Sequence, residues 1–167
     1  MRKFLFLPLL MLLAGCAGYH VGPVKPAYLK NVRTIGVPTF RNATLIPRLE
    51  VMTANCVIKQ LQNDGTFQVA PVEEADAILQ GTVTSVQRQP YRSLAGNVLA
   101  TTEFNLEMRI DYTLTDRLTG KVLAKHSVIG SSSFFVGGDV QQDEQQALPL
   151  AADKAAVQIV TSLSEGW

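Results

Sequence analysis

The sequence predicts an α+β fold, a two-layer sandwich with a mixed four- to five-stranded sheet and two helices packed on one face. Residues 101–115 alternate apolar and polar side chains with a period of two, which is typical of a strand with one solvated face. Apolar stripes of helical spacing occur within residues 47–63 and again within residues 142–163. The apolar faces of the two helices and of the sheet all need burial. Packing both helices on the apolar face of the sheet buries all three.

The first half of the domain predicts a strand at residues 32–37, a loop at 39–46 and a helix at 47–63. Gly65 suits the left-handed cap that ends such a helix, and a second strand follows at 67–69. The order strand, helix, strand predicts a parallel crossover. The apolar stripe of this helix is expected to comprise Val51, Ala54, Ile58 and Leu61.

The second half predicts three longer strands. Residues 77–87 are rich in β-branched side chains, and Gly81 is a candidate position for a bulge. Residues 88–97 contain a proline and a glycine, so they are expected to form a loop. The strand at 101–115 then returns as a hairpin partner at 121–135.

The final helix is expected from about Gln142, with Asp143 and Glu144 beside its positive N-terminal end. Pro149 must either kink this helix or mark its true start. The predicted apolar stripe comprises Ala152, Ala155, Ala156, Ile159, Val160 and Leu163.

Two strand reversals separate residues 88–97 from residues 136–142, so these two segments are expected at the same end of the sheet. The turn at residues 116–120 is then expected at the opposite end.

The N-terminal segment has the layout of an export signal. Arg2 and Lys3 precede an apolar run from Phe4 to Leu13, which is shorter than the roughly 20 residues of a permanent transmembrane helix. The ending Leu13-Ala14-Gly15-Cys16 resembles the lipobox of bacterial lipoproteins. An ordinary secretory signal with a chance cysteine, or a buried helix, is the alternative.

The lipobox resemblance implies removal of a signal peptide at residues 1–15, a lipidated tether at 16–30 and one domain at 31–167. Cys16 would carry a diacylglycerol on its thiol and an acyl chain such as palmitate on its new amine. Several acyl chains anchor a protein far more firmly than the single chain whose binding is marginal. No other cofactor is expected.

The charge of the chain argues against a nucleic-acid partner. Removing Arg2 and Lys3 from the 15 basic side chains leaves 13, against 14 acidic ones. Nucleic-acid binders carry a one-sided basic charge, which is missing here. Cys56 is left as a single thiol, and we interpret it as a small buried hydrophobe on a helix.

No pattern in the sequence supports catalysis. His20 and His126 lack zinc spacing, and Ser131-Ser132-Ser133 lacks the pattern of a nucleophile elbow. His126 is expected to be half-buried in a strand. The acids between residues 139 and 144 lack the ligand order of an EF-hand, so they are interpreted as helix-start residues. The chain is therefore predicted to be neither an enzyme nor a metal protein.

Arg88 and Arg92 flank Tyr91 in the predicted loop and form the candidate binding site. Arginine forks recognise phosphate and carboxylate groups, which makes an anion or a lipid headgroup a candidate ligand. A solvated loop that simply carries two charges is the alternative.

The order of several motifs resembles the LptE family of lipopolysaccharide-assembly lipoproteins. These motifs are Gly18-Tyr19-His20, Val32 to Val37, Pro38-Thr39-Phe40-Arg41-Asn42-Ala43-Thr44 and Ala75-Asp76-Ala77-Ile78-Leu79-Gln80-Gly81-Thr82-Val83. The resemblance implies an outer-membrane lipoprotein on the periplasmic side. It would partner and plug an LptD-type β-barrel, assemble lipopolysaccharide into the outer leaflet, and bind this lipid without catalysis. Ala17, in place of an aspartate after Cys16, agrees with outer-membrane sorting.

By the same resemblance, Arg92, and less directly Arg88, occupy the loop whose basic residues bind lipopolysaccharide in the family. The second basic position expected within 136–142 is missing, and Asp139 lies there instead. Solvent-facing residues of the long strand, such as Arg109, Asp111 and Thr113, are candidate contacts with the barrel.

A second resemblance implies a different function. Pro38-Thr39-Phe40-Arg41-Asn42 is similar to the Pro-Phe-x-Asn segment of LpoB-like lipoproteins, which activate peptidoglycan synthases. Such activators have to cross toward the cell wall, whereas a tether of about 14 residues spans at most roughly 50 Å. The short tether favours a partner in the outer membrane itself.

Overall fold

The computed structural model describes residues 25–94 and 97–166, and the side chains of all of these except 93–94 and 97–101. The predicted signal peptide, Cys16 and most of the predicted tether lie outside the described residues.

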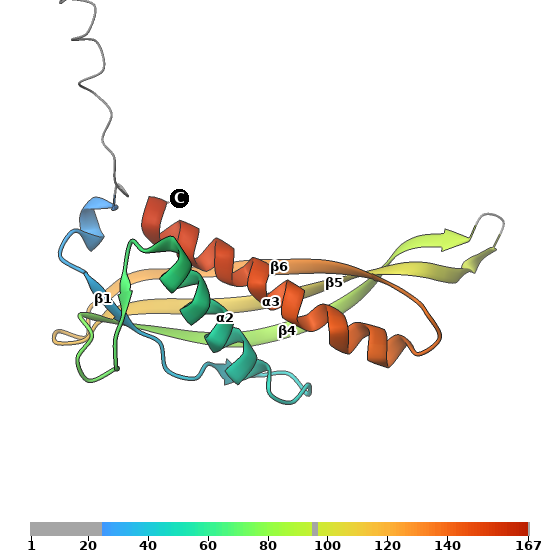
Figure 1. Ribbon diagram of the computed structural model, residues 1–167, viewed down its shortest axis with the longest axis horizontal. Coiled ribbons are helices and arrows are strands. Elements are labelled where there is room, and N and C mark those ends of the chain that lie inside the picture. Colours follow the sequence, from blue (N-terminus) through green and yellow to red (C-terminus); the bar gives the residue numbers. More distant parts are fainter. Residues whose placement is uncertain (1–24, 95–96, 167) are drawn as a thin grey trace, which may run out of the picture.

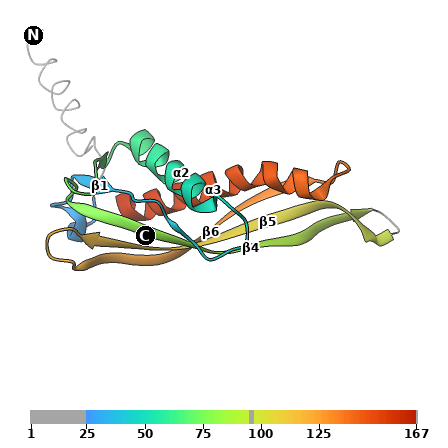
Figure 2. The ribbon, with the colours of Figure 1, turned by 90° about the horizontal axis from the view of Figure 1, so that it is seen from below.

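A mixed sheet of six strands lies beneath two helices, and Figure 2 shows both helices on the same side of it. The order of strands is β3-β1-β4-β5-β6, and β2 pairs with β4. The strands are β1 (Thr34–Gly36), β2 (Arg41–Asn42), β3 (Gln68–Val69), β4 (Ala77–Leu94), β5 (Asn97–Asp116) and β6 (Val122–Phe135). The helices are α2 (Leu49–Asp64), α3 (Val140–Glu165) and the short 3-10 turn η2 (Ala27–Leu29). The predicted α+β sandwich is confirmed, with two-residue β2 as an additional strand.

The parallel crossover is also confirmed. β1 pairs in parallel with β3, where Ile35 faces Val69, and in parallel with β4, where Ile35 faces Ala77. The helix between β1 and β3 is α2, and Gly65 ends it at φ 72° with its N–H donated to the carbonyl of Leu61.

The predicted stripe of α2 was wrong in part. Val51 is 47% exposed, whereas Val57 is fully buried. The residues that are buried follow one another mainly at intervals of four. They therefore form a row beside the predicted one, and the two rows share Ala54 and Leu61. The members of the buried row are Leu49, Thr53, Ala54, Val57 and Leu61.

The loop predicted at residues 88–97 was wrong for residues 88–94 and 97, and residues 95–96 lie outside the described residues. β4 runs on to Leu94 and pairs with β5 throughout, which makes the long hairpin that projects beyond α3 in Figure 1. Pro90 is tolerated because β1 and β2 pair with β4 only as far as Val83, so β4 is an edge strand beyond that point.

Gly81 has a packing role and is not a bulge. The register shift in this part of β4 lies between Val83 and Ser85. A Cβ atom at Gly81 would lie 2.3 Å from the ring of Phe40, so the missing side chain makes room for that buried ring.

α3 begins at Val140 and continues through Pro149, so the proline does not mark the start. Pro149 has no backbone N–H, so the carbonyl of Gln145 lacks its helical hydrogen bond. Gln145 is exposed, so water can bond to this carbonyl. All six residues of the predicted stripe are buried.

The core lies between the helices and the sheet. Leu106, Met108, Ile110 and Leu114 of β5 are fully buried, which confirms the predicted alternation. The chain joins this core before residue 31, because Leu29 is fully buried and Lys25 Nζ donates to the Val32 carbonyl at 3.0 Å. No described helix is both long enough and apolar enough to cross a membrane.

Candidate functional site

The candidate site lies at one end of the sheet, where the β4–β5 hairpin, the end of β6 and the start of α3 meet. We call this region the distal end. Arg92 pairs with Glu103, and Glu103 in turn pairs with Phe135, so the three strands are adjacent there. The turn at 116–120 lies at the other end, where Asp116 pairs with Ala77. The predicted placement of both regions is confirmed.

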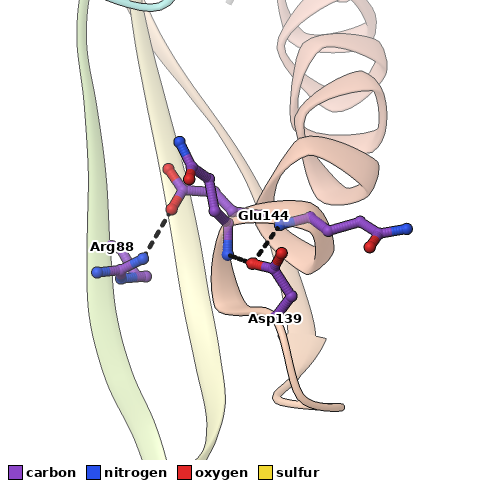
Figure 3. A network of polar contacts seen from close by, with 5 residues as sticks. Arg88, Asp139 and Glu144 are labelled. Carbon is purple, nitrogen blue, oxygen red and sulfur yellow. Dashed lines mark hydrogen bonds and ion pairs between the residues drawn. The ribbon is translucent and has the colours of Figure 1, made fainter.

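Arg88 bridges the sheet and the last helix. Its Nη1 donates to Glu144 Oε2 at 2.8 Å, and Figure 3 shows this contact between β4 and the first turns of α3. The guanidinium carbon also lies 5.1 Å from the centre of the Phe104 ring, within cation–π range. Arg88 therefore has two structural partners before any ligand binds.

Arg92 is more open. Its Nε lies 3.8 Å from Glu103 Oε2, and its side chain is 68% exposed whereas that of Glu103 is 8% exposed. Exposed Tyr91 and Phe135 add apolar surface to the same end. Of the two predicted binding residues, Arg92 offers more of its guanidinium to a ligand.

Acidic side chains at the start of α3 accept hydrogen bonds from nearby backbone N–H groups. Asp139 accepts hydrogen bonds from the backbone N–H groups of Gln141 and Gln142, as Figure 3 shows. Asp143 accepts from the N–H of Gly137 at 2.8 Å. These contacts confirm helix-start roles for the acids. Within residues 25–94 and 97–166, no group of three potential metal ligands occurs.

The charge of the distal end is not predominantly positive. Arg88 and Arg92 share it with a larger number of acids. These are Glu103, Glu107, Asp139, Asp143 and Glu144. An anionic ligand would gain from direct contact with an arginine fork rather than from a long-range positive field.

The helix-free face of the sheet is polar. Arg109 and Asp111 are exposed there, and Thr113 is half-buried. A hollow of about 440 Å³ on this face includes Asp111 and Thr113 in its lining, together with Arg41 and Lys125. The residues predicted as partner contacts therefore share one accessible surface.

Cys56 and His126 have side chains that can take part in chemistry, and each contacts a neighbouring element of the fold. Burial, together with nearby Asp153, raises the pKa of Cys56 to about 12, so the thiol stays protonated at neutral pH. His126 is exposed, so the predicted half-burial was wrong; it lies on edge strand β6, with its ring centre 6.0 Å from that of Tyr112. The hydroxyl of Tyr112 is hydrogen-bonded to Ser162 of α3.

Sequence reasoning missed two features that the structure reveals. Asp76 Oδ2 accepts the backbone N–H groups of Arg33 and Thr34 at 2.9 and 3.0 Å, which joins the start of β1 to the residue before β4. These hydrogen bonds hold the pKa of Asp76 below its usual value. Leu45 is wholly exposed in the loop after β2. The sequence carries no signal for it, because the adjacent Ile46 is equally apolar and is only half-exposed.

Comparison with known proteins identifies a family that this chain matches. The LptE family model, described as lipopolysaccharide-assembly, matches residues 32–163. A search of curated proteins found no match.

Several solved structures share the fold. A PelC variant from Paraburkholderia phytofirmans, described as a dodecamer, has a TM-score of 0.53 and 18% identity over 84% of this chain and 94% of its own. A minor lipoprotein from Acinetobacter baumannii has a TM-score of 0.54 and 15% identity over 81% and 95%. Lipoprotein B from Nitrosomonas europaea has a TM-score of 0.55 and 14% identity over 81% and 84%. Identities this low establish the fold alone.

Proposed function

The chain belongs to the LptE family of lipopolysaccharide-assembly proteins, and we propose that it acts as the lipoprotein partner and plug of an LptD-type outer-membrane β-barrel. In this role it helps to assemble lipopolysaccharide into the outer leaflet and binds the lipid without catalysis. The observation that carries the proposal is the family match over residues 32–163, which spans most of the described domain.

The surface of the domain is compatible with enclosure by a barrel. Both helices cover one face of the sheet, and the other face carries polar side chains such as Arg109, Asp111 and Thr113. A polar face suits contact with the water-filled, polar interior of an outer-membrane barrel. The contact needs no catalytic group.

Attachment to the outer membrane rests on Cys16, which lies outside the described residues. Its lipobox-like context supports acylation, and the packed segment that begins at Lys25 leaves only a short stretch between the lipid and the domain. Arg92, and Arg88 to a lesser extent, are the proposed contacts for phosphate or carboxylate groups of lipopolysaccharide.

Purification of C-terminally tagged protein from outer membranes in mild detergent, followed by mass spectrometry, tests the proposal. We expect a stoichiometric large β-barrel, and we expect Cys16→Ala to move protein that lacks a barrel partner out of the membrane fraction. Recovery of a peptidoglycan synthase instead would favour the LpoB-like function and contradict the barrel proposal. A Cys16→Ala protein that stays in the membrane pellet without a barrel would contradict lipid anchoring.

A further inference from the structure

A hollow of about 500 Å³ lies between β6 and α3. Val157 of α3 is 44% exposed there and Val128 of β6 is half-buried, so two apolar side chains are left partly uncovered. The lining contains no Asp, Glu, Lys or Arg side chain. It consists of Tyr112, His126, Ser127, Val128, Val157, Gln158, Thr161 and Ser162.

The hollow adjoins the open edge of the sheet. Among the described residues, β6 pairs only with β5, so the backbone N–H and carbonyl groups on its other edge face no strand. Native proteins commonly cover such an edge with another segment of the chain. An extended, uncharged segment would suit both the edge and the hollow.

The described part of the chain begins close to one end of this hollow. A Cβ atom at Gly166, just after α3, would lie 2.8 Å from the ring of Pro26, and Figure 1 shows the blue η2 turn near the C-terminal end of α3. Ser162, which lines the hollow, is hydrogen-bonded to Tyr112. Burial raises the pKa of Tyr112, and nearby Tyr28 of η2 adds to the rise. Residues that precede Pro26 therefore enter the domain beside the hollow.

The distance along α3 can be estimated from the helical rise. Ser162 and Val157 precede Gly166 by four and nine residues, which correspond to about 6 and 14 Å at roughly 1.5 Å per residue. A segment that runs from Pro26 along α3 has to span these distances to occupy the hollow.

The preceding residues have a suitable length and composition. Residues 17–24 read Ala-Gly-Tyr-His-Val-Gly-Pro-Val and contain no Asp, Glu, Lys or Arg, like the lining of the hollow. Pro23 favours an extended polyproline-type conformation, which rises about 3.1 Å per residue with three residues per turn. In that conformation Val24 and Val21 lie on the same side, at about 6 and 16 Å from Pro26.

We propose that residues 21–24 of this chain dock in the hollow between β6 and α3, with Val24 near Ser162 and Val21 near Val157. This inference goes beyond the proposed function and does not depend on a barrel partner. Docking leaves only residues 17–20 free between Cys16 and the domain. The free stretch then spans at most about 14 Å instead of about 28 Å, which directs the edge of β6 toward the lipid.

A second copy of the chain suits the hollow less well. A two-fold contact between two β6 edges would place one hollow against the other, and neither supplies a protruding group to fill it. The preceding segment belongs to the same chain, and a short flexible connection gives an effective concentration in the millimolar range.

Disulfide formation in the full-length lipoprotein, purified in detergent micelles, tests the inference. Cys56→Ala removes the half-buried thiol from every variant. Val21→Cys together with Val157→Cys is expected to form an intramolecular disulfide under mild oxidation, because docking holds the two side chains together. A shift in electrophoretic mobility without reducing agent measures the rate.

Val21→Cys together with Asn63→Cys is the matched control. Asn63 is exposed at the end of α2, four residues before Phe67, whose ring lies 4.7 Å from Lys25 Nζ. An undocked segment would therefore reach Asn63 as well. We expect the pair with Val157→Cys to crosslink at least tenfold faster than the control pair. Equal rates, or disulfides only between two copies, would overturn the inference.

Labelling of Val24→Cys with a water-soluble maleimide provides a second readout. Val157→Asp places a charge in the hollow and is expected to speed labelling at least fivefold. Leu150→Asp is the control, because Leu150 is 56% exposed on the same helix but does not line the hollow. It is expected to leave the rate unchanged. Equal labelling rates with and without Val157→Asp, or an equal increase with Leu150→Asp, would also overturn the inference.

Discussion

Arg88 and Arg92 at the distal end differ in what already holds each side chain. The guanidinium of Arg88 is bonded to Glu144 at 2.8 Å and lies near the Phe104 ring. Arg92 is 68% exposed and has one ion-pair contact at 3.8 Å. A ligand that bound Arg88 would compete with Glu144, whereas Arg92 is open to a ligand.

We therefore expect Arg92→Asp to weaken lipopolysaccharide binding more than Arg88→Gln. An exposed charge-assisted contact contributes about 1 kcal/mol, which corresponds to roughly a fivefold rise in Kd. Titration of purified protein with fluorescent lipopolysaccharide measures the effect. Lys121→Asp, at the opposite end of the sheet, serves as the control. Unchanged binding by Arg92→Asp, or an equal loss with Lys121→Asp, would show that the distal arginine is not the contact.

Asp76 makes a contribution to stability that depends on pH. The backbone N–H groups of Arg33 and Thr34 stabilise its carboxylate and lower its pKa in the folded state. The stabilisation is therefore complete above the unfolded pKa, near 4, and is lost as the pH falls through the lower folded pKa.

Asp76→Asn is expected to lower the free energy of unfolding at neutral pH by up to about 1 kcal/mol, because the group is exposed and its interactions are screened. The difference between wild type and variant should shrink as the pH falls through the lowered folded-state pKa of Asp76, where its side chain also becomes neutral. Urea denaturation at neutral pH and at a series of acidic pH values measures it. A difference that stays constant with pH would mean that the charge of Asp76 plays no part.

The contact between α3 and β6 depends on the absence of a side chain at Gly130. A Cβ atom at Gly130 would lie 2.0 Å from the carbonyl oxygen of Ala151 and 2.7 Å from the backbone nitrogen of Ala155. Ser132 Oγ donates to the carbonyl of Ala147 along the same line of contact. The alanine-rich stripe of α3 lets the helix backbone approach the strand this closely.

Gly130→Ala is expected to destabilise the domain by at least about 1–3 kcal/mol, because helix backbone rather than a flexible side chain must move. The midpoint of thermal or urea unfolding provides the measurement. Gly137→Ala is the matched control, since a Cβ atom there would make only ordinary contacts of 3.6 Å and more. Similar unfolding midpoints for the two variants would contradict the close-packing argument.

Some elements were predictable because their signals are local. The alternation around Leu106 to Leu114 is a property of the strand itself, and it was confirmed residue by residue. The segment around Pro90 was predicted wrongly, because a proline ends a strand only where its missing N–H would have to pair with a neighbouring strand. Beyond Val83, β4 pairs only with β5, so backbone groups on its other edge need no partner strand.

The layers of the domain separate the side chains that stabilise the fold from those that are accessible to a partner. The helices and the inward face of the sheet form the core, whereas the helix-free face carries polar side chains that the domain does not need for its own packing. Substitutions on that face should therefore affect a partner more than the fold.

Thr113→Trp tests this separation. Thr113 is half-buried on the helix-free face, and tryptophan is favoured in strands, so the free energy of unfolding should stay within about 0.5 kcal/mol of wild type. If a barrel encloses this face, the added bulk should reduce recovery of the barrel several-fold. Normal recovery with normal stability would indicate that this part of the face is not covered.

Local patterns in the sequence are enough to predict four parts of the fold. These are the long alternating strand, its hairpin partner, the alanine-rich helix and the parallel strand–helix–strand unit. It also carried the motif order of the LptE family, which the match over residues 32–163 confirms. Three features follow only from how the chain packs: which row of α2 is buried, the ion pair between Arg88 and Glu144, which are 56 positions apart, and the full exposure of Leu45. Periodicity is a property of residues that are close in the sequence. Burial and ion pairing depend on which segments, far apart in the sequence, pack against one another.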